Sequence, residues 1–269
     1  AKLKGYYNMQ YTTGISVGTP GQYQEILPDS GSYVLVTLGS KLKGHNVFNA
    51  ANSKTVDIPN PKKEYEIEYG SANAYGKCGT DHVKVKKAKS KNVEMLIDDG
   101  GKESIQPGGM YYAAAFDGVA GLGPTIFKGD LLGGFGYHDF GFKMSKKNSG
   151  SLTLGCAVEG YKYEYVKMIG SRYWTVPMQA VCAGAGSCYT THAGPALIDS
   201  GTSLVYLPNS VVTNLNAKIG NVASCSSKGL PTLTFKFGKS DGSGGYVEAS
   251  LKPSEYIIKE DAGTNKYQP

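Results

Sequence analysis

The segments LPDSGSYVL (27–35) and LIDSGTSLV (197–205) carry the tetrad Asp-Ser-Gly-Ser/Thr in the same frame at two distant places in the chain. Each tetrad follows an apolar pair and precedes another apolar run, so each Asp is expected in a glycine-containing turn between two buried strand segments. A single Asp-Ser-Gly is a common turn tripeptide, but two copies at matched positions indicate two related halves.

Length and composition limit the class of protein. The chain has 269 residues and a mass of 28.5 kDa, enough for one large domain or two of roughly 130 residues each. Hydrophobic residues make up 40% and charged residues 19%, which excludes a disordered chain, and no apolar run is long enough to span a membrane. The 37 glycines and 20 tyrosines have no three-residue period, which excludes collagen and favours tight turns between short strands.

Hydrophobic periodicity predicts an all-β fold with a few short helices. Asn209 and Gly220 mark the ends of one expected helix, 210–219, and a shorter one is expected near 126–132. The expected strands are rich in β-branched or aromatic residues and are bounded by turn residues; they cover 5–17, 64–69, 81–85, 151–155, 161–168, 173–181, 232–237 and 246–251.

The charge balance and the cysteines exclude several kinds of site. The formal net charge is +6, but Arg172 is the one arginine and the lysines are scattered apart from 84–91, so we expect a solvated surface and no nucleic-acid partner. The five cysteines contain no C-x-x-C pair and the four histidines have no metal-ligand spacing, so no metal and no cofactor are expected. Cys182 and Cys188 are close enough to form a disulfide across a hairpin, which suits a secreted protein.

Two half-buried carboxylates from duplicated halves would form a pair of interacting acids. Two acids in close contact do not both ionise readily, because the two negative charges repel each other. Such a pair therefore holds one proton over a wide pH range. The ionised member can then take a proton from water while the protonated member donates to a carbonyl oxygen, which is general acid–base hydrolysis of an amide. The catalytic pair would be Asp29 and Asp199.

Beyond the tetrads, collinear segments resemble those of the pepsin-like (A1) aspartic proteases. The resemblance covers nearly the whole chain and implies a bilobal acid protease fold, with a peptide-binding cleft, that hydrolyses peptide or protein substrates and binds statine-type inhibitors. The segments that carry it are YTTGISVGTPGQ (11–22), EYEIEYGSANAYGKCGTDHVKV (64–85), FDGVAGLGP (116–124), GSLTLG (150–155), RYWTVPMQAV (172–181), ALIDSGTSLVYLP (196–208), LPTLTFKFG (230–238) and LKPSEYII (251–258).

The resemblance also implies roles for individual residues. Asp29 and Asp199 would be the catalytic pair, and a flap over the substrate would carry Tyr69, Gly70 and Ser71. The supporting residues fall in the two tetrads: Ser30 and Ser200 would bridge the two loops, Ser32 and Thr202 would bond the outer carboxylate oxygens, and Gly31 and Gly201 would let the backbone bend.

Several residues depart from the family pattern. Pro28 stands where an apolar strand residue is usual, and we expect it to distort the first site because proline removes a backbone donor. Val36 replaces the tryptophan that the flap tyrosine contacts, so different flap packing is expected. Tyr33 stands at a position that is usually small, and Ala72 replaces a flap glycine, which would stiffen the flap tip.

The predicted lobes are 1–157, with the first tetrad and the flap, and 158–269, with the second tetrad. The second lobe is expected to be incomplete, because the family's later strand beside the second aspartate has no match. Three explanations stay open: a second chain supplies the strands, the sequence is part of a longer one, or the molecule is a degenerate relative.

An aspartic endopeptidase in a secreted or endolysosomal/vacuolar compartment is the leading interpretation. The alternative is a catalytically weak or inactive pepsin-like protein that binds a ligand without cleaving it, which Pro28 and Val36 favour. Intact aspartates and glycines in both tetrads argue against this alternative. A basic nucleic-acid-binding β protein has only the net charge in its favour.

Overall fold

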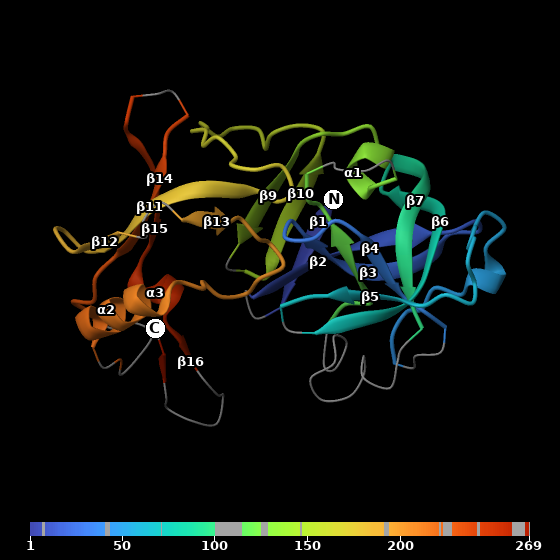
Figure 1. Ribbon diagram of the computed structural model, residues 1–269, viewed down its shortest axis with the longest axis horizontal. Coiled ribbons are helices and arrows are strands. Elements are labelled where there is room, and N and C mark those ends of the chain that lie inside the picture. The colour runs from blue at the N-terminus through green and yellow to red at the C-terminus, as the bar shows by residue number, and fades with distance from the viewer. Residues whose placement is uncertain are drawn as a thin grey trace. The chain divides into compact units, whose positions relative to one another are not determined.

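A computed structural model describes residues 1–6, 9–40, 44–70, 72–99, 115–124, 129–145, 147–190, 194–220, 222, 228–240, 243–259 and 267–268 (Figure 1). Strands dominate these residues and the helices are few and short. The predicted all-β class with a few short helices is therefore confirmed.

The chain divides into two compact units. The first comprises Ala1–Tyr161, Ser171–Trp174 and Asp199–Leu204, and the second comprises Lys162–Gly170, Thr175–Ile198 and Val205–Pro269. The Asp199 tetrad thus belongs to the same unit as the Asp29 tetrad, although the two are far apart in sequence. The lobes predicted from the sequence, 1–157 and 158–269, stay a prediction.

The described strands of the first unit form one ten-stranded sheet in the order β5-β6-β7-β4-β8-β3-β2-β1-β10-β9. Its longest members, β6 and β7, run side by side as an antiparallel pair (Figure 1). The strands are β1 (Lys2–Tyr6), β2 (Gln10–Val17), β3 (Gln22–Asp29), β4 (Leu35–Leu38), β5 (Tyr65–Glu68), β6 (Asn73–Val85), β7 (Ala88–Asp98), β8 (Gly118–Gly121), β9 (Phe140–Ser145) and β10 (Ser149–Leu154).

The short strand β8 lies at the centre of this sheet and positions Asp29. It pairs parallel with β3, with Asp29 opposite Gly121, and antiparallel with β4. All its residues are buried. A methyl group on Gly118 would lie 2.3 Å from the Val36 carbonyl oxygen, so only glycine fits there. The glycines of β8 therefore let β3 and β4 approach closely at the point where β3 delivers Asp29.

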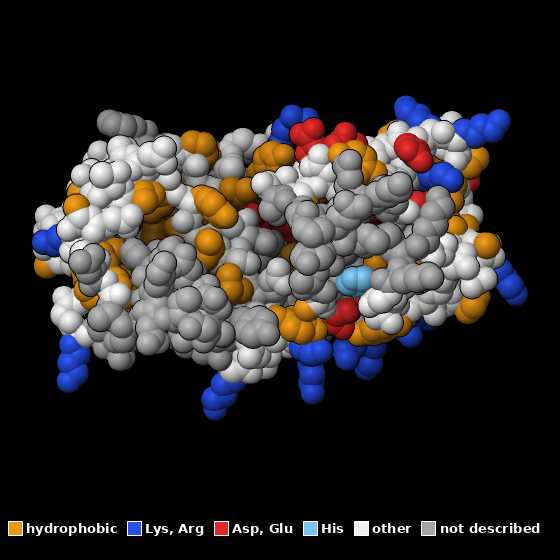
Figure 2. Space-filling model, turned by 90° about the horizontal axis from the view of Figure 1, so that it is seen from below, with side chains coloured by type: hydrophobic (Ala, Val, Ile, Leu, Met, Phe, Trp, Pro, Cys, Tyr) orange, Lys and Arg blue, Asp and Glu red, His pale blue; other side chains and the backbone are white. Residues whose placement is uncertain are grey.

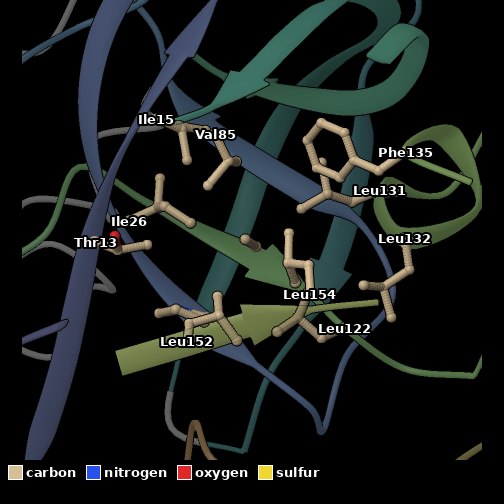
Figure 3. Close-up of a pocket in the computed structure, with 12 residues that line it drawn as sticks. Thr13, Ile15, Ile26, Val85, Leu122, Leu131, Leu132, Phe135, Leu152 and Leu154 are labelled. Carbon is tan, nitrogen blue, oxygen red and sulfur yellow. The ribbon is translucent and has the colours of Figure 1, made fainter. Parts of the chain in front are cut away.

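Apolar side chains fill the core behind this strand. Figure 3 shows a small gap in that core, with side chains from several strands and from the helix region near Leu131 pointing toward one another across it. The gap is lined by Thr13, Ile15, Ile26, Pro28, Val85, Ala120, Leu122, Leu131, Leu132, Phe135, Leu152 and Leu154. Because Thr13 is the one polar side chain in this lining, the gap is a packing feature and lacks the groups of a polar binding site.

The second unit is built on a smaller sheet. In its described part, β12-β11-β14-β15 is the strand order and β13 also pairs with β11. A helix covers this sheet with Val211, Leu215 and Ile219, which pack with Val181 and Phe235. The elements are β11 (Thr175–Ala183), β12 (Cys188–Thr190), β13 (Pro195–Leu197), α2 (Asn209–Ile219), β14 (Leu233–Gly238), β15 (Tyr246–Leu251), α3 (Pro253–Tyr256), β16 (Ile258–Lys259) and β17 (Tyr267–Gln268).

Cys182 and Cys188 stand opposite each other where β11 pairs with β12, and a disulfide joins them. Cys78 and Cys156 are free thiols, half-buried and exposed respectively. Cys225, the fifth cysteine, lies outside the described residues.

Most predicted elements are found, with shifted bounds. The helix predicted at 210–219 is α2, and Gly220 follows it with a φ of 71°, a backbone angle that side-chain-bearing residues rarely adopt. The stretch 5–17 forms two strands, β1 and β2. The helix predicted near 126–132 falls partly outside the described residues, and helix α1 occupies Leu131–Gly134, where the Asp130 side chain accepts a hydrogen bond from the Gly133 N–H.

The strand predicted at 161–168 is wrong. This stretch has no regular structure, and Tyr161, Tyr163 and Tyr165 are 54%, 45% and 74% exposed. An alternating pattern stabilises a strand only where one face is buried, and here the tyrosine face remains in solvent.

The visible surface carries many basic side chains. Lys and Arg side chains extend into solvent from several places on the face that Figure 2 shows. None of the helices among the described residues combines the length and the apolar character that crossing a bilayer requires.

Candidate active site

The first tetrad forms a tight turn at the end of β3 that holds the Asp29 carboxylate by two local hydrogen bonds. The backbone N–H of Gly31 donates to Oδ1 over 2.9 Å, and the Ser32 hydroxyl donates to Oδ2. Both oxygens are thus oriented by residues of the same tetrad.

The second tetrad repeats this arrangement after β13. The Gly201 N–H donates to Asp199 Oδ1 over 2.8 Å, and the Thr202 hydroxyl donates to Oδ2. The same atoms in the same order hold the two carboxylates, so the repeated sequence produces a repeated local geometry.

Two serines connect the tetrads to each other. The N–H of Ser30 donates to the hydroxyl oxygen of Ser200 over 3.0 Å, and the N–H of Ser200 donates to that of Ser30 over 2.9 Å. The Ser200 hydroxyl in turn donates to the carbonyl oxygen of Pro28 over 2.8 Å. These reciprocal bonds fix the two turns face to face within one unit.

Glycine at the third tetrad position makes this approach possible. A methyl group on Gly31 would lie 2.6 Å from Asp199 Cγ, and one on Gly201 would lie 2.4 Å from Asp29 Oδ1. Real Cβ atoms do not come so close to other heavy atoms. Each glycine therefore faces the opposite aspartate, and the two carboxyl groups share one small space.

The two aspartates differ in environment. Asp29 is only 6% exposed, whereas Asp199 is half-buried. Burial is the main cause that raises the pKa of Asp29, to about 6, and the hydrogen bond and negative charge of Asp199 raise it further, while Ser32 and Gly31 oppose the change. Asp29 therefore retains its proton in mildly acidic solution.

The predicted flap is the hairpin of β5 and β6. At its tip the N–H of Tyr69 donates to the carbonyl oxygen of Ala72 over 2.9 Å. Gly70 is exposed with open space around its Cα, and Ser71 lies outside the described residues.

The Tyr69 ring packs on a core cluster that includes Val36. Its hydroxyl oxygen is buried and makes no hydrogen bond of normal geometry within the described chain. Burial, followed by the charge of Asp29, raises the pKa of this phenol, whereas Ser32 lowers it. With Val36 at the position where the family pattern has tryptophan, the flap tyrosine packs against apolar side chains.

Pro28 does not interrupt the first site, contrary to the expected distortion. β3 keeps its register with β8 from Ile26 to Asp29, and its pairing with β2 ends at Ile26, before the proline. The hydrogen bonds around Asp29 match those around Asp199. Pro28 is tolerated because its ring belongs to the apolar core and its carbonyl oxygen accepts from Ser200.

Sequence reasoning missed three residues near Asp29. The indole N–H of Trp174 donates to the Leu122 carbonyl oxygen over 2.7 Å, and the N–H of Leu122 donates to the Asp29 carbonyl oxygen over 2.7 Å. Tyr173 stacks against Tyr33. The sequence carries no signal for these contacts, because they join segments that are distant along the chain. No group of His, Cys, Asp and Glu within the described ranges could hold a metal ion.

Comparison with known proteins agrees with this geometry. The family model described as eukaryotic aspartyl protease matches residues 10–267. Similar proteins include pepsin A of Sus scrofa, 28% identical over 96% of this chain and 71% of its own length, and cathepsin D of Rattus norvegicus, 28% identical over 96% and 69%. The vacuolar aspartic protease of Candida albicans is also 28% identical, over 96% of this chain and 66% of its own length.

The chain belongs to the eukaryotic aspartyl protease family. Within that family it is a divergent pepsin-like member, since its identity to the pepsins and to cathepsin D is below 30%.

Proposed function

We propose that this protein is an aspartic endopeptidase in which Asp29 and Asp199 activate a water molecule against a peptide bond. The observation that carries the proposal is the hydrogen-bonded pair of carboxyl groups, one buried with a raised pKa, at the meeting point of two matched turns. Two carboxyl groups that share one proton in a small space can act as acid and base in the same step.

In the proposed mechanism Asp199 is ionised and accepts a proton from the attacking water. Protonated Asp29 donates its proton to the carbonyl oxygen of the substrate, which gives a tetrahedral gem-diol. When the C–N bond breaks, Asp199 gives the proton it took from water to the leaving nitrogen, and a gem-diol hydroxyl returns a proton to Asp29 as the new carboxyl group forms. Ser32 and Thr202 keep the outer oxygens directed. Tyr69 and Gly70, with Ser71, would form the flap that covers the substrate and excludes water.

The proposal is tested with an unfolded protein substrate in mildly acidic solution. We expect cleavage that a statine-type inhibitor blocks and that Asp199→Asn removes. The exposed Asp139 provides a matched control, because Asp139→Asn makes the same chemical change outside the site. Unchanged cleavage in Asp199→Asn would contradict the mechanism.

A second candidate function is binding without cleavage. The observation in its favour is the Tyr69 hydroxyl, which is buried and makes no hydrogen bond of normal geometry with any described residue, while its ring packs on the cluster that contains Val36. A flap that closes imperfectly could still hold a peptide but leave water poorly positioned. Inhibitor binding measured by calorimetry together with no detectable turnover would favour this function over the first.

The compartment belongs to the proposal as well. The disulfide between Cys182 and Cys188 suits an oxidising environment, and one similar protein is named a vacuolar aspartic protease. We therefore propose a secreted or endolysosomal/vacuolar location. Detection of the mature protein in the cytosol alone, with both cysteines reduced, would contradict it.

We also propose that a strand from a second polypeptide covers the apolar residues around the second tetrad. Leu197, Ile198, Val205 and Tyr206 are exposed, and β13 pairs only with β11 among the described strands. In the first unit, β8 pairs with β3, and the residues of β3 that lead to Asp29 are buried. Light scattering should then give a mass above 28.5 kDa, with little binding of a dye that reports apolar surface. A monomer that does not bind the dye would contradict this proposal.

A further inference from the structure

Tyr33 stacks on a tyrosine that lies far from it in the sequence. It follows Ser32 directly, and its ring centroid is 5.0 Å from that of Tyr173, with a tilt of 37° between the planes. Aromatic pairs at this separation attract each other beyond the simple burial of their surfaces. The stack therefore gives the residue after Ser32 a fixed position.

Gly123 packs against the same residues. Its N–H donates to the Ser32 carbonyl oxygen over 2.8 Å. A methyl group on Gly123 would lie 2.5 Å from Tyr33 Cδ1 and 2.9 Å from the Ser32 carbonyl oxygen. The bulky Tyr33 thus fits because the neighbouring segment has no side chain there, and Ser32 is held between the two.

Trp174, next to Tyr173, holds the segment that passes beside Asp29. Its indole N–H donates to the Leu122 carbonyl oxygen, and its ring meets Phe140 edge to face with centroids 5.8 Å apart. Leu122 itself donates to the Asp29 carbonyl oxygen. Two adjacent aromatic residues therefore contact both backbone segments that flank the Asp29 carboxylate, one through Tyr33 and one through Leu122.

We propose that Tyr33, Tyr173 and Trp174 form an aromatic brace whose role is to keep the Ser32 hydroxyl aligned on Asp29, which makes them positioning residues for hydrolysis. This inference rests on the proposed endopeptidase function. The brace acts through Ser32, whose hydroxyl donates a hydrogen bond to Asp29 Oδ2. The backbone of Ser32 is held by the N–H of Gly123, and the next residue, Tyr33, is held by its stack on Tyr173.

Loss of the brace would have a specific electrostatic consequence. The Ser32 hydrogen bond is the largest of the influences that lower the pKa of Asp29. If Ser32 moves away, that influence disappears and Asp29 releases its proton at a higher pH than in the wild type. A change that merely loosened the fold elsewhere would not shift this titration.

The test compares Tyr33→Ser, which removes the ring, with Tyr33→Phe, which keeps it. For Tyr33→Ser we expect kcat to fall about tenfold with KM within about twofold, since a small misplacement of a catalytic group lowers the rate strongly. The basic limb of the pH–rate profile should move to higher pH. Tyr33→Phe should have the wild-type kcat, and the basic limb of its pH–rate profile should lie where it does in the wild type.

Tyr173→Ala provides a second route, because Tyr173 is 40% exposed and its truncation leaves the core intact. It should reproduce the Tyr33→Ser effects. An effect on KM alone would mean that the rings contact substrate and would overturn the brace, as would a Tyr33→Phe variant as impaired as Tyr33→Ser.

Carbon-13 titration of the aspartate carboxyl groups separates this inference from the proposed function. If the wild type cleaves no substrate, the endopeptidase proposal fails, but the brace still predicts a higher midpoint for Asp29 in Tyr33→Ser than in the wild type. Equal midpoints in the two proteins would overturn the brace whatever the activity.

Discussion

The two Asp-Ser-Gly turns have the same internal hydrogen bonds and very different surroundings. In both, a glycine N–H and a hydroxyl hold the carboxylate. Around Asp29 the apolar flanks belong to β3 and β4, which both pair with β8, and Leu27 is 7% exposed, whereas the matched Leu197 is 43% exposed. Turn geometry is thus a property of the tetrad itself, while burial comes from the strands around it.

The burial of the first turn explains why Asp29 is suited to the role of proton donor. Burial is the largest cause that raises the pKa of Asp29, and burial depends on β8 and on the core behind it. The position of the first tetrad thus gives Asp29 a raised pKa, which suits the proton donor of a general acid–base mechanism.

The largest expected effect is on stability, from the same substitution at the two matched leucines. Leu27→Ala should lower the free energy of unfolding by about 2 to 5 kcal/mol, because it leaves a cavity beside β8. Leu197→Ala should change it by less than about 1 kcal/mol, since Leu197 is already in contact with solvent. Denaturant titration of both variants checks the pair, and equal losses would mean that the second turn is as deeply packed as the first.

The next effect is the pH dependence of stability. Folded Asp29 holds its proton up to about pH 6, whereas an unfolded aspartate releases it near 3.8. The folded state thus binds more protons between these values, so the free energy of unfolding should fall, by roughly 3 kcal/mol, as the pH rises through that window. Denaturation midpoints at several pH values measure this slope. Asp29→Asn should flatten it, and an unchanged slope in that variant would assign the effect to another group.

Gly31→Ala and Gly201→Ala test whether the two turns face each other at close range. Either methyl group would overlap the opposite aspartate, so the carboxyl groups must separate. We expect a loss of roughly hundredfold in kcat/KM for each variant. Gly238→Ala is the control, because Gly238 lies in β14 outside the site and its methyl group would meet only ordinary contacts, 3.6 Å from Gln179 and 3.8 Å from Pro177. Full activity in both tetrad variants would refute the close approach.

A smaller effect is expected from the bonds between the turns. Ser200→Ala removes a hydroxyl that accepts from Ser30 and donates to Pro28, and it should destabilise the protein by about 1 to 3 kcal/mol. Ser171→Ala, at an exposed position, should have little effect. Thermal unfolding compares the two variants, and similar midpoints would show that the bridge contributes nothing to stability.

Much of this site was predictable because it depends on short sequence patterns. The tetrads indicated both aspartates and their supporting hydroxyls, and Gly220 indicated the end of α2. Strands β3, β4 and β8 were harder to predict, because buried strands lack the alternation that marks a half-exposed one.

Other features required the three-dimensional arrangement. The tolerance of Pro28 follows from where β2 stops pairing with β3, and the stack of Tyr33 on Tyr173 follows from chain segments meeting in space. The segment 161–168 has the alternation typical of a strand, but it is not a strand, because its tyrosine face does not pack against the core. In each case the outcome depends on whether a segment that is distant in sequence lies beside the residue.

The central claim, that Asp29 and Asp199 together activate water, is tested most directly by kcat/KM for a peptide substrate in four proteins: the wild type, Asp29→Asn, Asp199→Asn and the control Asp139→Asn. The account predicts a fall of at least about a hundredfold in each of the first two variants, no change in the control, and a wild-type rate that declines above about pH 6 as Asp29 loses its proton. Wild-type activity in either Asp29→Asn or Asp199→Asn would contradict it.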